Sequence, residues 1–227
     1  MYLAGSCGKT GGPPSCHESC LANKESLEMG EGILLGPLLL FAAVMCLTPG
    51  PNVVMITASA ANFGFRHAIP HMLGIALGFG VIIVAVGLGL AGLFAAEPRL
   101  HAVLKYAGAA YLLYLAWRIA QADAAGGDSR RAKPINFVEA MLFQWINPKG
   151  WVIAVGALAA YTTAGGDVRL QTVVVAGVLA TVCLASVVLW AGFGVAIARF
   201  LGRPSARRAF NWSMAGLLAI SLIPVFW

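Results

Sequence analysis

Two short proline-containing stretches interrupt long apolar segments of this chain, and their residue types could bind a small charged ligand. Residues 47–52 read Leu-Thr-Pro-Gly-Pro-Asn within the apolar residues 33–61, and residues 145–150 read Trp-Ile-Asn-Pro-Lys-Gly within residues 137–161. Proline has no amide hydrogen and its ring clashes with the preceding turn, so each stretch is expected to break a helix. The freed backbone groups need protein partners or a wet cavity if the helix crosses a bilayer.

The groups at such breaks fit the two charged ends of an amino acid. Free amides where a helix restarts favour a carboxylate, and the carbonyls before the break suit an ammonium group. Lys149 is a cation within an apolar segment, where it could hold a carboxylate or instead snorkel to an interface. For the amides of Asn52 and Asn147, helix capping is the alternative role. The predicted substrate-binding residues are Thr48, Pro49, Gly50, Pro51, Asn52, Asn147, Pro148 and Lys149.

Composition indicates what these stretches are embedded in. Of the 227 residues, 59% are hydrophobic and 11% are charged, whereas soluble domains contain about 25% charged residues. The apolar runs are too long for barrel strands, so the chain is predicted to be an all-α polytopic membrane protein. The net charge of +6 comes from basic residues in short loops, which is a topology signal rather than an indication of nucleic-acid binding. No phosphate-binding loop motif suggests ATP-driven transport.

The hydropathy pattern predicts six transmembrane helices. They cover residues 33–61, 71–94, 102–119, 135–161, 170–200 and 210–226. The first and the fourth carry the proline motifs, so the chain is predicted to form two inverted three-helix repeats, 33–119 and 135–227. Interruptions in corresponding helices of two repeats are a sequence sign of a transporter's binding site.

The basic residues of the loops predict the orientation of the helices. The loops after the first, third and fifth helices hold nine Lys and Arg residues, and those after the second and fourth hold three. Basic loops stay in the cytoplasm, so both termini are predicted to lie outside. Residues 1–28 are expected to form a disordered tail preceding a transporter domain at 29–227. Met29 directly precedes the first apolar run, which suggests an alternative start site.

A few further side chains could take part in coupling. Glu139 is the only acid within the predicted membrane helices. It could carry a coupled proton, or it could stabilise the positive end of the fourth helix. His67 and His71 flank the first cytoplasmic loop and could titrate near neutrality; His71 is retained with Glu139 as a candidate coupling residue.

The cysteines and glycines invite structural interpretations. Cys46 and Cys183 are expected to be packing residues, although a redox pair in a membrane enzyme is an alternative. Gly74 and Gly78 form a G-x-x-x-G pair that lets another helix approach closely, either within the monomer or in a homodimer. No metal, cofactor or catalytic constellation is predicted, because Cys16, His17 and Cys20 lack a second ligand cluster.

The motifs resemble those of a known family. The Pro-Gly-Pro-Asn core of residues 47–52, residues 108–117 (Gly-Ala-Ala-Tyr-Leu-Leu-Tyr-Leu-Ala-Trp) and Asn147-Pro148-Lys149 are similar to hallmarks of the LysE/RhtB family of amino-acid exporters. The resemblance covers about residues 30–227. It implies efflux of amino acids or related small metabolites across a bacterial inner membrane, driven by the proton-motive force.

The sequence therefore predicts a secondary exporter that works by alternating access, not an enzyme. Its partners are expected to be protons, the lipid bilayer and an amino-acid substrate. Neutral amino acids such as homoserine, threonine or leucine are favoured as substrates, because no membrane acid lies near the breaks to pair with a cationic side chain. The alternatives are export of basic amino acids or of another small metabolite, a membrane-embedded enzyme and a sensor subunit.

Overall fold

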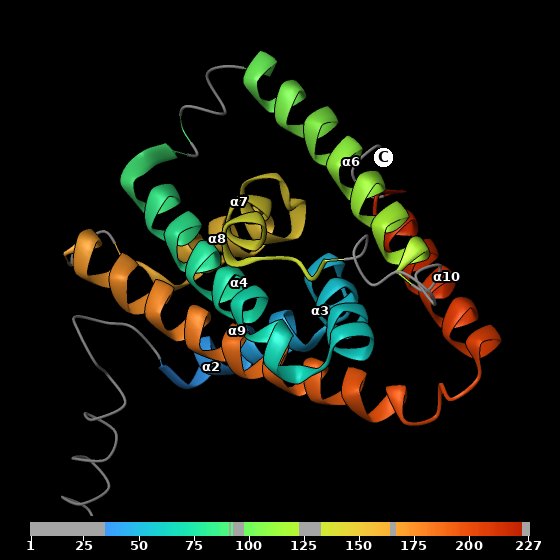
Figure 1. Cartoon of the computed structure of the whole chain (residues 1–227). Helices are drawn as coiled ribbons and strands as arrows, with labels where there is room; N and C mark the ends of the chain where they lie inside the picture. The colour runs from blue at the N-terminus through green and yellow to red at the C-terminus, as the bar shows by residue number, and fades with distance from the viewer. Residues whose placement is uncertain (1–34, 91, 93–97, 123–132, 164–166, 224–227) are drawn as a thin grey trace, which may run out of the picture.

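The computed structural model describes residues 35–90, 92, 98–122, 133–163 and 167–223, and these residues form helices joined by short connections (Figure 1). No strand occurs within these ranges. The all-α class predicted from the sequence is thereby confirmed for this part of the chain. The predicted tail at residues 1–28 lies outside the described residues.

Both predicted helix breaks are present. α2 (Leu35–Leu47) and α3 (Pro51–Phe63) meet at a 58° bend, and Pro51 occupies the first position of α3. α7 (Phe137–Ile146) and α8 (Pro148–Tyr161) are separated by Asn147 alone. Proline is favoured at the first helical position, where a missing amide hydrogen costs nothing. The prolines therefore end one helix and begin the next.

The second predicted helix begins earlier than expected. α4 (Phe65–Ala85) starts at Phe65 instead of residue 71 and continues into the π-helical segment η1 (Val86–Leu90). Gly64, at φ 82°, reverses the chain between α3 and α4 in one residue, a conformation that glycine adopts without strain. The expected cytoplasmic loop is thus a single-residue turn, and His71 lies inside α4 rather than at its end.

The remaining helices are α6 (Pro98–Gln121), α9 (Val168–Ala198) and α10 (Pro204–Ile220). α9 is capped by Asp167, whose side chain accepts from the amides of Arg169 and Leu170. α10 begins at Pro204, whereas the sequence predicted a start at residue 210. The prediction was late because the first two turns of α10 carry Arg207 and Arg208, which lower the average hydropathy there.

Length and composition identify the parts of the described chain that can cross a membrane. Two continuous helices qualify, the α4–η1 segment and α9, and the bent α2–α3 pair would make a third. Large apolar side chains such as Leu40, Leu189 and Phe193 are more than half exposed. An exposed apolar surface of this kind requires a covering partner, and a bilayer supplies one. The prediction of six spans in two inverted repeats stays a prediction.

α4 lies at the centre of the bundle and packs most extensively on α7 and α9, while α2 and α3 cover α9 and α6 pairs with α10 (Figure 1). Gly74 faces the Phe137 carbonyl and Ala140, and Gly78 faces Met141 and Gln144. The G-x-x-x-G pair thus serves contact between α4 and α7 within one chain. It gives no support to the homodimer that the sequence left open.

We predict that Gly78→Ala destabilises the bundle. A Cβ there would lie 2.9 Å from the backbone of Met141 and from Cγ of Gln144, so α7 would have to move, at a cost of about 1–3 kcal/mol. Gly80→Ala is the control, because its Cβ would lie 3.4 Å from Ala180. Thermal unfolding of both variants in detergent tests this, and equal melting temperatures would contradict the close packing of α4 on α7.

Candidate functional site

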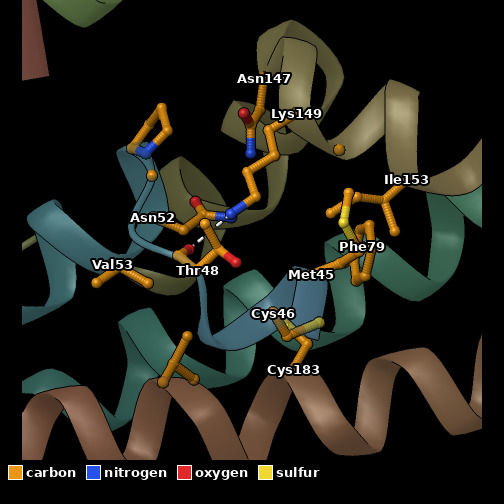
Figure 2. A pocket seen from close by; sticks show the side chains of 14 residues that line it. Met45, Cys46, Thr48, Asn52, Val53, Phe79, Asn147, Lys149, Ile153 and Cys183 are labelled. Atoms are coloured by element: carbon orange, nitrogen blue, oxygen red, sulfur yellow. Dashed lines mark hydrogen bonds between the residues drawn. The ribbon is translucent and has the colours of Figure 1, made fainter. Parts of the chain in front are cut away.

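A cavity lies between the two helix breaks and is walled by residues of α2, α3, α4, α8 and α9 (Figure 2). Its polar lining includes Thr48, Asn52, Asn147 and Lys149. Its volume is about 40 Å³, enough for roughly three water molecules. Two segments that are far apart in sequence, each interrupted by a proline, therefore share one small polar cavity.

Lys149 crosses this cavity from the first turn of α8 to the α2–α3 break. Its Nζ donates to the Thr48 carbonyl oxygen at 2.6 Å, as Figure 2 shows. The stem of the side chain runs over Gly50, where an added Cβ would lie 3.0 Å from Lys149 Cδ. The break supplies a carbonyl that no helix amide occupies, and the glycine supplies the space for a cation to reach it.

Other side chains donate to two further carbonyls near the end of α2. The Val44 carbonyl accepts from both the amide and the hydroxyl of Thr48, and the Cys46 carbonyl accepts from Ser186 Oγ of α9 at 2.8 Å. A carbonyl buried among apolar helices without a partner would cost several kcal/mol. The bend in the first broken helix is therefore stabilised by contacts with α8 and α9.

The second break is satisfied in a similar way. Pro148 cannot donate to the Gln144 carbonyl, which accepts instead from the Asn147 amide at 3.2 Å. The indole N–H of Trp151 donates to the Trp145 carbonyl at 2.8 Å, and the two indole rings pack edge to face with centroids 6.4 Å apart. Trp151 of α8 thus closes the end of α7.

Gln144 joins the amides of both breaks. It is fully buried, and it exchanges two hydrogen bonds with Asn52: Asn52 Nδ2 donates to Gln144 Oε1 at 2.8 Å, and Gln144 Nε2 donates to Asn52 Oδ1 at 3.1 Å. Asn147 Nδ2 also donates to Gln144 Oε1, at 3.4 Å. Neither asparagine side chain caps its helix, so the capping interpretation of Asn52 and Asn147 is wrong for this structure.

The wall next to the polar end is apolar and rich in sulfur. Met45, Phe79, Ile153 and Val187 line it, together with Cys46 and Cys183. Cys46 of α2 and Cys183 of α9 are free thiols, and both line this wall. The cavity therefore has a polar end at the breaks and a neutral wall that could receive an uncharged side chain.

Six of the eight predicted binding residues line the cavity. These are Thr48, Gly50, Pro51, Asn52, Asn147 and Lys149. Pro49 and Pro148 create the breaks but are not among the lining residues. The structure thus brings the two predicted motifs together, while a role in substrate binding stays a prediction for each residue.

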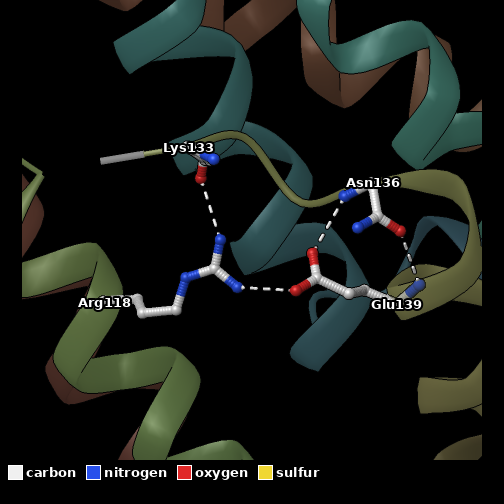
Figure 3. A network of polar contacts seen from close by, with 4 residues as sticks. All are labelled: Arg118, Lys133, Asn136 and Glu139. Atoms are coloured by element: carbon white, nitrogen blue, oxygen red, sulfur yellow. Dashed lines mark hydrogen bonds and ion pairs between the residues drawn. The ribbon is translucent and has the colours of Figure 1, made fainter. Parts of the chain in front are cut away.

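Glu139 belongs to a different cluster. Its carboxylate accepts from Arg118 Nη1 at 3.1 Å and from the Asn136 amide at 3.0 Å, while Asn136 Oδ1 accepts from the Glu139 amide (Figure 3). This is a capping box at the start of α7, with an ion pair to the end of α6. Arg118 also donates to the Lys133 carbonyl, so the cluster ties α6 to α7.

His71 is completely buried in α4, and neither ring nitrogen has a hydrogen-bond partner among the described residues. Burying a polar group without a partner is costly, so such a group calls for an explanation. The sequence placed His71 at an interface because the second helix was predicted to begin there. The earlier start of α4 is the reason that it is buried.

Sequence reasoning missed Gln144 as a site residue, and it considered Cys46 and Cys183 together only as an alternative redox pair. Gln144 lies about one helical turn before Pro148, which is the spacing that places its side chain beside the break. Its presence as a polar residue within an apolar helix was the available signal. The cysteines lie in α2 and α9, and nothing in their spacing indicates contact.

Comparisons with known proteins agree on one family. A family model described as LysE type translocator matches residues 43–225. The chain is 30% identical over 196 residues to a cysteine/O-acetylserine efflux protein of Shigella flexneri serotype 5b, covering 86% of this chain and 98% of the relative. It is 29% identical over 195 residues to the protein so named in Escherichia coli K12, with the same coverage. No solved structure matches the chain.

We predict that Ser186→Ala destabilises the protein by about 1 kcal/mol, because it leaves the Cys46 carbonyl without a side-chain donor. Ser213→Ala is the matched control, since Ser213 Oγ is exposed and donates to the Ala209 carbonyl of its own helix. Melting temperatures in detergent measure the difference. If both variants melt with the wild type, the carbonyls of the break do not depend on their partners from other helices.

Proposed function

This chain belongs to the LysE type translocator family, and from that premise we propose that it exports small amino acids of the cysteine and O-acetylserine type, which have uncharged side chains. The observation that carries the proposal is the cavity shared by the two broken helices, with Lys149 and two asparagine amides at its polar end. Transporters place substrate sites at such interruptions. In this proposal the protein is a secondary transporter of the bacterial inner membrane.

The named relatives change the expected substrate. The sequence favoured homoserine, threonine or leucine, whereas the relatives are cysteine/O-acetylserine efflux proteins. Cysteine and O-acetylserine carry small side chains without charge, and these suit the wall formed by Met45, Phe79 and Ile153. The residues that line this cavity include no Asp or Glu, which argues against basic amino acids.

The carboxylate of the substrate is proposed to bind Lys149 and the start of α3. The first amides of a helix have no partner within it, and Asn52 and Val53, which follow Pro51 in the first turn of α3, line the cavity. These amides and the Lys149 ammonium group favour an anion. The bond from Lys149 to the Thr48 carbonyl would be exchanged for one to the substrate.

The cavity must widen for transport, because its present volume fits a few waters rather than an amino acid. The packing of the helices supports rocking of two inverted repeats. α4 contacts α9, and α6 contacts α10, so corresponding helices of the two halves meet. The first broken helix packs on α9, and the second packs on α4. A pseudo-twofold relation between the halves would produce this reciprocal pattern.

Proton coupling is proposed to involve His71. It is a titratable side chain buried at the centre of the bundle, with no hydrogen-bond partner in the part of the chain that the structure describes. A conformational change that wets the ring would let it take up a proton. Glu139 already has an ion pair and a capping role. The structure therefore favours His71 over Glu139 for coupling.

Transport in proteoliposomes tests the proposed function. We expect saturable counterflow of O-acetylserine and cysteine by the wild-type protein. Lys149→Met should lower this flux by at least about tenfold, because it removes the cation that binds the substrate carboxylate. Asn52→Ala should lower it as well, because it removes the amide that pairs with Gln144 beside the cavity. Lys133→Met is the control, since Lys133 is exposed and does not line the cavity. Wild-type flux in both cavity variants would remove the site assignment, and no flux in folded wild-type protein would refute the exporter.

The coupling role of His71 has its own signature. We predict that His71→Gln abolishes accumulation driven by a pH gradient but retains counterflow, because exchange requires no net movement of protons. His67→Gln is the matched control, because His67 is exposed in the first turn of the same helix, where its ring bonds to the Phe63 carbonyl. Gradient-driven accumulation by His71→Gln at the wild-type level would exclude His71 as the coupling residue.

A further inference from the structure

The direction of the Gln144 amide is set by a backbone carbonyl. Gln144 Nε2 lies 2.9 Å from the carbonyl oxygen of Ala140, one turn earlier in α7. A carbonyl oxygen can only accept, so the nitrogen of the Gln144 amide must face it. Gln144 Oε1 is then fixed on the other side, toward the two helix breaks.

The orientation of the Gln144 amide also determines the orientation of the Asn52 and Asn147 amides. Gln144 Oε1 can only accept, so Asn52 and Asn147 must both turn their Nδ2 groups toward it, at 2.8 and 3.4 Å. Gln144 thereby uses both of its amide hydrogens and both acceptor positions of its oxygen. It has no capacity left for a ligand.

The remaining acceptor is Asn147 Oδ1. Asn147 is 3% exposed and lines the cavity, and its Oδ1 has no hydrogen-bond donor among the described residues. Two other acceptors at the polar end are already in use, since the Thr48 carbonyl accepts from Lys149 and Asn52 Oδ1 accepts from Gln144. A buried oxygen without a donor is a strong acceptor for a charged N–H group.

We propose that Gln144 is a positioning residue that fixes the Asn147 amide so that its Oδ1 receives the α-ammonium group of an amino-acid substrate. The proposal rests on the proposed function in that it takes the cavity as the substrate site. It assigns the two charged ends to different places, with the carboxylate at Lys149 and the ammonium group at Asn147. Gln144 holds the second of these places without touching the substrate.

Close packing keeps Gln144 in this arrangement. An added Cβ at Gly78 of α4 would lie 2.9 Å from Gln144 Cγ, so the side chain fills the space beside the glycine and cannot swing away. Side chains held in this way present their partners without further loss of conformational freedom on binding. The contact of α4 with α7 is therefore part of the site.

The chain offers a matched control elsewhere in the bundle. Asn62 Nδ2 donates to the Ala58 carbonyl, one turn earlier, and to Asn211 Oδ1, each at 2.8 Å. Asn211 Nδ2 returns a bond to Asn62 Oδ1 at 3.2 Å. Asn211 is fully buried, as Gln144 is, and this pair does not line the cavity. Both pairs are reciprocal amides anchored to a backbone carbonyl.

The test measures recognition of the amine by the purified full-length chain. Apparent affinities are taken from ligand-induced thermal stabilisation, with S-methylcysteine and its des-amino analogue 3-(methylthio)propionate as probes. The wild type should prefer the amine-containing probe by at least about tenfold. Gln144→Met should lose most of this preference, and Asn211→Leu should keep it even where it lowers the melting temperature.

A second variant guards against misfolding of Gln144→Met. Asn147→Ala removes the proposed acceptor directly and should lose the same preference. The proposal is overturned if the wild type does not discriminate between the probes, if Asn147→Ala discriminates as the wild type does, or if Asn211→Leu loses discrimination to the same extent as Gln144→Met. Failure of the exporter proposal is recognised separately, as amine-dependent stabilisation without any flux in proteoliposomes.

Discussion

Backbone groups freed by a helix break must find partners where water is scarce, and this constraint governs the structure of the protein. Side chains close both breaks. At the first break, Lys149 donates to the Thr48 carbonyl and Ser186 donates to the Cys46 carbonyl. At the second break, Trp151 donates to the Trp145 carbonyl. Lys149 lies in α8 and Ser186 in α9, whereas the carbonyls to which they donate lie at the end of α2. The first break therefore depends on helices that are distant in sequence, and the contacts that assemble the bundle also form the polar cavity.

Close contact between α4 and α7 connects this constraint to the geometry of the site. Gly74 and Gly78 let the two helices approach until α7 touches the surface of α4. Gln144 is thereby held beside both breaks, where it bonds to Asn52 and Asn147. A packing feature that resembles a dimerisation motif in the sequence thus positions polar groups inside one chain. The close contact of the two helices holds the amides of Gln144, Asn52 and Asn147 in fixed orientations.

The sequence was sufficient to predict the two breaks, because proline within an apolar run has one physical consequence. Their meeting at one cavity followed from the expected symmetry of the halves. Helix ends were less predictable, since Gly64 shortened a predicted loop to one residue and so buried His71. Gln144 escaped prediction for another reason: its importance comes from contacts between helices, which the spacing of residues along one helix does not reveal.

The distribution of polar groups in the cavity favours recognition of the substrate by its carboxylate and ammonium groups rather than by a charged side chain. Lys149 and the asparagine amides stand at one end, and the wall beside them consists of neutral groups such as Phe79, Ile153 and Cys183. An uncharged side chain loses little by entering such a wall, whereas a cationic one would lose its hydration without finding a carboxylate. Because Lys149 bonds to Thr48 in the narrow cavity, a substrate must replace interactions that hold the breaks closed. In the proposed mechanism, binding of the zwitterion and widening of the cavity are thus coupled through the same polar groups.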